Sequence, residues 1–96
     1  MLDMTYKQRR LNEIEASRLE AARLDAIATH TSITAWILLA TRDLNEAETW
    51  LDKPDIESRP YILKIADFAI ALANDRLEMV DFTLQMHGRD ATLIGS

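Results

Sequence analysis

The chain is 96 residues long, carries a net charge of −5 and contains no cysteine, which excludes a disulfide framework and thiolate chemistry. With 48% hydrophobic residues but only two glycines and two prolines, the composition indicates an ordered, helix-rich domain. Basic and acidic side chains balance in residues 1–30, at five each, whereas residues 31–96 carry six basic and eleven acidic ones. A duplex-binding protein normally presents a basic face, so this balance disfavours nucleic-acid binding.

Neither an export signal nor a membrane span is expected from the sequence. The basic residues near the start are not followed by the apolar run of a signal peptide. The longest central apolar run, Ala35–Ala40, is far shorter than the roughly 20 residues that a spanning helix needs. We therefore expect one soluble, cytoplasmic domain over residues 1–96.

The first helix is predicted from Thr5 to about Ala28. Thr5 and Gln8 have the spacing of a capping box, and good helix formers follow without a glycine or proline. Surface ion pairs are expected at Arg9–Glu13, Glu15–Arg18 and Glu20–Arg23. The apolar seam is thin and consists of Leu11, Ile14, Ala21, Leu24 and Ile27 (or Ala28). Residues 1–31 are therefore interpreted as a helical arm that docks on its own chain or on another.

The second helix is expected over Ile33–Leu51. Stiff threonines and the N-cap candidate Ser32 predict an interruption at residues 29–32, with a single bent helix from Thr5 to Leu51 as the alternative. The helix should end before Pro54, because the residue before a proline resists helical geometry. Its apolar row is Ile33, Ile37, Ala40, Leu44, Ala47 and Leu51, and core packing is expected for the flanking Trp36 and Trp50. Its outer face is assigned to Arg42, Asp43, Glu46 and Glu48.

The third helix is predicted from Pro60 to His87, with Ser58 as N-cap candidate and Gly88 just beyond the end. The short polar connection over residues 52–59 favours antiparallel neighbours, so residues 32–88 would form a helical hairpin and residues 89–96 a flexible tail. One face of this helix is polar and expected to be solvated: Lys64, Asp67, Asn74, Asp75, Glu78, Asp81 and Gln85.

The rest of the third helix is apolar in two rows, and two rows imply two packing neighbours. The first row, expected to pack on the second helix, is Ala66, Ile70, Ala73, Leu77, Val80 and Leu84. The second row begins at Ile65 and contains the residues predicted to form a partner or dimer interface: Phe68, Leu72, Met79, Phe82 and Met86. Alternatively the N-terminal helix of the same chain covers them as core. The expected fold is all-α, a hairpin plus an N-terminal helix, completed as a dimeric helical bundle.

No catalytic residue, metal site or cofactor is predicted. His30 and His87 have no second histidine or cysteine at ligand spacing. The carboxylate pairs, such as Asp43 with Glu46 and Asp75 with Glu78, lie on predicted polar faces, whereas acid–base or metal chemistry needs an inward face. Nucleophile elbows and glycine-rich phosphate loops are missing from the sequence. A non-enzymatic protein is therefore expected.

Two other functions compete with this expectation. The helical format and the arginines Arg9, Arg10, Arg18 and Arg23 are similar to helical chorismate mutases, whose active sites bind a dianion with mid-chain basic residues. Here no lysine lies between Lys7 and Lys53, which argues against that chemistry. A DNA-binding regulator would have to use a basic N-terminal arm with Lys7, Arg9 and Arg10.

The segment Ser32–Ala40, the connection over residues 52–59 and the helix over residues 66–80 resemble the helical hairpin of short, uncharacterised bacterial proteins. In format the chain also resembles quorum-sensing antiactivators, small proteins that bind a transcriptional activator and block it. The resemblance implies a small regulatory binder whose partner is another protein. Stoichiometric masking of a helical surface by the second apolar row is the mechanism we expect.

Overall fold

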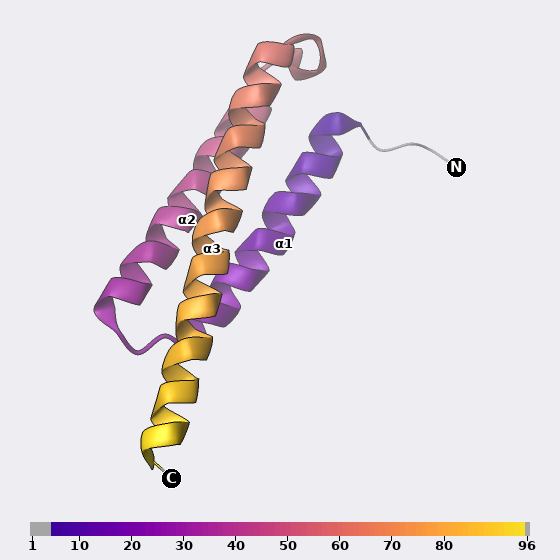
Figure 1. Ribbon diagram of the computed structural model, residues 1–96. Coiled ribbons are helices and arrows are strands. Elements are labelled where there is room, and N and C mark those ends of the chain that lie inside the picture. The colour runs from indigo at the N-terminus through magenta and orange to yellow at the C-terminus, as the bar shows by residue number, and fades with distance from the viewer. Residues whose placement is uncertain (1–4, 96) are drawn as a thin grey trace.

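The computed structural model describes the backbone of residues 5–95 and the side chains of residues 5–86. It contains α1 (Tyr6–Ile27), α2 (Thr31–Leu51), the 3-10 helix η1 (Ile56–Ser58) and α3 (Pro60–Gly95), with no strand over that range. Figure 1 shows α2 and α3 running antiparallel, with α1 alongside the hairpin. The prediction of an all-helical, three-helix chain is confirmed, and α1 and α2 are separate helices.

At the start of α1, only one of the two hydrogen bonds of the predicted capping box forms. The Thr5 hydroxyl accepts the backbone N–H of Gln8 at 3.1 Å, but the Gln8 side chain donates to Asn12 at 3.0 Å. A second N-terminal donor, the backbone N–H of Lys7, is bound at 2.9 Å by the Glu57 carboxylate from the loop before α3. Because the first turn of α1 holds no acidic residue, Glu57 supplies the negative charge that a helix N-terminus favours.

The break between α1 and α2 covers residues 28–30 and overlaps the predicted interruption at residues 29–32, but Thr31 and Ser32 already belong to α2 and the cap differs. His30 is the N-cap, with extended backbone geometry, and its imidazole Nδ1 accepts the backbone N–H of Ser32 at 3.3 Å. The prediction of Ser32 as N-cap is wrong, because Ser32 is already the second residue of α2. A histidine can cap a helix in this way because its ring nitrogen accepts the backbone N–H two residues further on, as the hydroxyl of a serine at position 30 would.

The connection between α2 and α3 holds a short helix that the sequence did not reveal. Asp55 adopts a left-handed conformation (φ 55°, ψ 36°), which aspartate tolerates better than most residues, and η1 follows directly. Ile56 is thereby buried under the end of the bundle. Ser58 donates its hydroxyl to the carbonyl of Asp55 at 2.8 Å, so its prediction as the N-cap of α3 is wrong. Pro60 begins α3 as expected.

The third helix is longer than predicted, because it continues past His87 and Gly88 to Gly95. A C-terminal glycine stops a helix by adopting positive φ, and no glycine among the described residues does so. Within a helix a glycine costs only about 1 kcal/mol relative to alanine, which a 36-residue helix tolerates. The predicted tail over residues 89–96 is therefore helical up to Gly95, and α3 extends past both other helices (Figure 1).

The core lies where the two predicted apolar rows meet. In each row fully buried alanines alternate with larger side chains, so the α2 and α3 backbones approach closely. Ile14 and Leu24 of α1 are fully buried against this hairpin, so the arm docks on its own chain. At the end of the α1 seam, Ala28 packs on the core while Ile27 remains 53% exposed. The core prediction for the two rows is confirmed.

Candidate functional site

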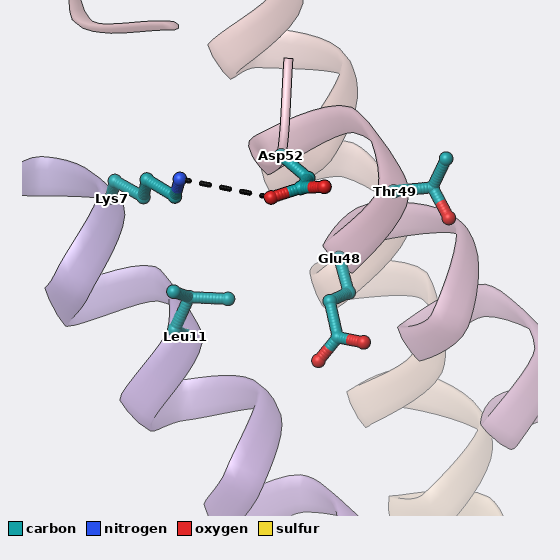
Figure 2. A pocket seen from close by; sticks show the side chains of 5 residues that line it. All are labelled: Lys7, Leu11, Glu48, Thr49 and Asp52. Carbon is teal, nitrogen blue, oxygen red and sulfur yellow. Dashed lines mark ion pairs between the residues drawn. The ribbon is translucent and has the colours of Figure 1, made fainter. Parts of the chain in front are cut away.

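A groove of about 450 Å³ lies between the first turns of α1 and the end of α2 (Figure 2). Lys7 and Leu11 project into it from α1, opposite Glu48, Thr49 and Asp52. The Lys7 ammonium lies 4.0 Å from an Asp52 carboxylate oxygen, and the Asp52 side chain is 86% exposed. An exposed pair at this distance contributes little to stability. The Thr49 hydroxyl donates to the Asn45 carbonyl at 3.0 Å and not to either carboxylate of the groove, so this groove is not where we place the function.

Polar contacts hold α1 on the hairpin along one edge of α3. The Asp67 carboxylate lies 2.8 Å from Arg10 Nε and also accepts the Tyr6 hydroxyl. One heptad on, Asn74 accepts the Ser17 hydroxyl at 2.6 Å, and a further heptad on, Asp81 pairs with Arg23 at 3.2 Å. The prediction of a solvated face misses these contacts: Asn74 stays exposed and the side chains of Asp67 and Asp81 are 35% and 36% exposed, but all three also bind α1. A polar residue repeated every seven positions lines one side of a helix and can meet a parallel neighbour.

On α2, Asn45 and Glu48 also hold α1 in place, because each accepts a hydrogen bond from Arg18 at 2.8 Å. Of the surface pairs predicted for α1, the pair Glu20–Arg23 forms at 2.6 Å. Glu13 pairs with Arg10 and not with Arg9. Arg18 pairs with Glu48 of α2 and not with Glu15. Periodicity could not reveal these cross-helix partners, because they are 27 to 61 residues apart in the chain.

Hydrogen bonds across this interface favour the charged forms of its arginine and glutamate side chains and the neutral form of Tyr6. Burial raises the pKa of the Tyr6 hydroxyl, and its hydrogen bond to Asp67 raises that pKa further. Burial lowers the pKa of Arg10, but hydrogen bonds to Tyr6 and Glu13 more than offset it, so that pKa is raised overall. The hydrogen bond from Arg18 lowers the pKa of Glu48, and the bond from Arg23 lowers that of Glu20, both against a smaller effect of burial.

From these shifts we expect the protein to lose stability in acid. The pKa of Glu48 lies below its ordinary value of 4.5 in the folded state, so folding favours the ionised carboxylate. This stabilisation is complete above pH 4.5 and is lost as the pH falls through the lower, folded-state value. The midpoint of thermal unfolding, followed by circular dichroism between pH 7 and pH 3, should decline less in Glu48→Gln than in the wild type. Parallel declines would contradict the assignment.

The opposite edge of the hairpin carries a second charged cluster. Asp43 and Arg76 form an ion pair at 3.0 Å between Oδ2 and Nε, with only 15% and 23% of their side chains exposed. These two atoms lack hydrogen-bond alignment, so the contact acts through charge. The Arg76 guanidinium also lies 5.7 Å from the centre of the Trp36 ring, at cation–π distance. The prediction that Asp43 lies on an outer, solvated face is therefore wrong.

Of the two tryptophans, only one follows the expectation of core packing. Trp50 is partly buried and packs against the core, whereas Trp36 is 47% exposed. Trp36 shares a small groove of about 200 Å³ with Ile33, Met79 and Thr83, at the boundary between α2 and α3. Trp36 therefore forms part of an open surface that includes Met79.

The predicted interface row on α3 is open to solvent. Phe68 is 71% exposed, Met79 and Phe82 are each 61% exposed, Met86 is 37% exposed and Leu72 is partly buried. The alternative that α1 covers these side chains is not what the structure shows, because α1 contacts the edge with Asp67, Asn74 and Asp81.

Tyr61, which is 76% exposed, extends this row by one heptad toward the start of α3. We call the resulting set the α3 stripe: Tyr61, Ile65, Phe68, Leu72, Asp75, Met79, Phe82 and Met86. Its spacing alternates four and three residues throughout, the pattern of a coiled-coil seam, and Asp75 is its single charge. A groove of about 490 Å³ on the stripe is lined by Asp75, Glu78, Met79 and Phe82.

The exposed apolar area of the α3 stripe is large for a small protein. Taking about 200 Å² for a fully exposed large side chain, its five exposed members present roughly 600 Å². The largest apolar patch on a typical monomer measures about 300–600 Å² and is often functional. The stripe is therefore the candidate binding surface of this protein, and it contains every interface residue predicted from the sequence.

No family model, no curated protein and no solved structure matches this chain. Within the part of the chain that the structure describes, no three histidine, cysteine or acidic side chains gather as metal ligands would. None of the helices in that part combines the length and the apolar character that a membrane span requires.

Proposed function

We propose that this protein is a non-enzymatic regulator that binds a helical surface of a partner protein through the α3 stripe and masks it, in the manner of an inhibitor or antiactivator. The observation that carries the proposal is the row of large apolar side chains left exposed at helical spacing on α3. A groove-binding helix presents its anchors at this spacing, and methionine and aromatic side chains suit such adaptable surfaces.

The proposal includes a homodimer in the cytoplasm as the resting state. In that state a second copy would cover the α3 stripe until a partner replaces it, so the dimeric bundle and the masking complex would use the same surface. Exchange of one apolar helix for another keeps the stripe covered in both states, which limits non-specific association.

Ion pairing within the chain weakens the support for the two other functions. Four of the five basic side chains in residues 1–30, those of Lys7, Arg10, Arg18 and Arg23, pair with carboxylates of α2, α3 or the residue after α2. Cations that are already paired are poorly placed to bind DNA phosphates as a free arm. The same pairing engages three of the four arginines that made a chorismate-mutase site worth considering.

Capture from a lysate of the cells that express the protein tests the proposal, with quantitative mass spectrometry as the readout. The wild-type chain should recover a protein partner in stoichiometric amount, and the variant Phe68→Glu/Phe82→Glu should lose it at least about tenfold, as expected when central apolar anchors are removed. Leu19→Glu is the matched control, because Leu19 is an equally exposed apolar residue on α1 and should leave capture unchanged. Equal recovery by all three baits would contradict the proposal.

A further inference from the structure

We infer that a second copy of this chain binds the α3 stripe with the two α3 helices antiparallel, in a register centred between Leu72 and Asp75. This specifies the homodimer included in the proposed function, and it rests on observations that do not involve a foreign partner. They are the area of the stripe, the chemistry of its facing pairs and the position of its single charge.

The exposed area matches the size of a dimer interface. Adding Trp36, which borders Met79, brings the exposed apolar area of each copy to roughly 700 Å² on the same scale of about 200 Å² per side chain. Specific complexes bury between about 600 and 1,000 Å² on each partner.

An antiparallel arrangement makes the stripe complementary to itself. With the two-fold axis between Leu72 and Asp75, Phe68 faces the partner's Met79 and Ile65 faces the partner's Phe82. Tyr61 then faces the partner's Met86. Each aromatic ring therefore meets a methionine or an aliphatic side chain, and contacts between sulfur and aromatic rings are favourable. Because the two copies are related by two-fold symmetry, each of these contacts occurs twice in the dimer.

Asp75 decides between the two possible orientations. In a parallel pair, Asp75 would face Asp75 of the partner subunit inside an apolar seam, and like charges in such a seam repel. In the antiparallel pair, Asp75 faces the partner's Leu72, and the two Asp75 positions are offset by three residues, about 4.5 Å along the axis, so their repulsion is weaker than in the parallel pair. The helix macrodipoles also favour the antiparallel arrangement. A single polar residue in a seam is known to set register and orientation at some cost in affinity.

Engineered cysteines test this arrangement directly, because the chain has none of its own. We would purify Phe68→Cys and Met79→Cys separately, oxidise each alone and as an equimolar mixture at low micromolar concentration, and quantify disulfide-linked dimer on non-reducing gels. The antiparallel register places the two Phe68 positions roughly 16 Å apart along the axis, at about 1.5 Å per residue, beyond disulfide reach. Cross-linking is therefore expected in the mixture and at least several-fold less in either variant alone.

A mixture of Leu19→Cys with Met79→Cys supplies the collisional background, and light scattering on the unmodified wild-type chain should give twice the chain mass of 11.0 kDa. Efficient cross-linking of each variant alone would overturn the antiparallel arrangement in favour of a parallel one. A monomeric wild type, with the mixture at background, would overturn the second copy as occupant. Neither result depends on partner capture, so failure of the dimer and failure of the proposed function are distinguishable.

Discussion

Replacing Leu44 with alanine is expected to lower the free energy of unfolding by about 3–5 kcal/mol, the range seen for leucine truncations in tightly packed cores. Leu44 is fully buried, in the middle of the α2 row that packs on α3. The substitution removes three carbon atoms and leaves a cavity, and α2 cannot collapse into it because Ala40 and Ala47 already set the helix separation. Marginal total stability makes such a loss a large fraction of the whole.

Urea denaturation followed by circular dichroism measures this loss, at one fixed protein concentration because self-association would add to the apparent stability. Leu38→Ala is the matched control, since it makes the same chemical change on the same helix at a side chain that is 65% exposed. A loss within about 0.5 kcal/mol is expected there. If both variants lost the same amount, the assignment of the buried row would be wrong.

Replacing Asp43 with alanine is expected to cost about 1–3 kcal/mol, because it leaves the Arg76 guanidinium unpaired in a largely buried position. Removing one member of a fully buried pair costs about 3–5 kcal/mol. The expected value here is smaller, since 23% of the Arg76 side chain reaches solvent and its contact with Trp36 persists.

A double-mutant cycle separates the ion pair from packing. Arg76→Met keeps the aliphatic stem that covers the helix boundary, so Asp43→Ala/Arg76→Met should lose clearly less than the sum of the single losses, with a coupling of about 1 kcal/mol or more. The measurement is again the free energy of unfolding in urea, for the wild type and the three variants. Additive losses would show that Asp43 and Arg76 stabilise the hairpin independently.

Most of the helix boundaries were predictable because they depend on neighbouring residues. Thr5 caps α1 through a donor three positions away, Pro60 opens α3, and the connection that contains Pro54 ends α2. The two errors at helix starts, Ser32 and Ser58, have separate local causes: His30 caps α2 ahead of Ser32, and the Ser58 hydroxyl donates back to the Asp55 carbonyl. Gly88 was misjudged for a different reason, since a glycine permits a helix end without requiring it.

The buried rows of α2 and α3 and the apolar stripe also followed from the sequence. Alternating steps of three and four residues place side chains on one side of a helix whatever surrounds it. Periodicity therefore identified Phe68, Leu72, Met79, Phe82 and Met86 as one surface. Periodicity could not show whether α1 covers that surface, because the narrow apolar row of α1 could pack on several faces of the hairpin.

Three helices, most of their ends and the two apolar rows of α3 follow from the sequence, because they depend on residues close together in the chain. The position of α1 emerges only on folding, because it depends on polar contacts between residues far apart in the chain. Asp67, Asn74 and Asp81 look like solvent-facing residues until Arg10, Ser17 and Arg23 are brought opposite them. Because α1 takes that polar edge, the apolar α3 stripe stays uncovered, and with it the surface on which we place the function.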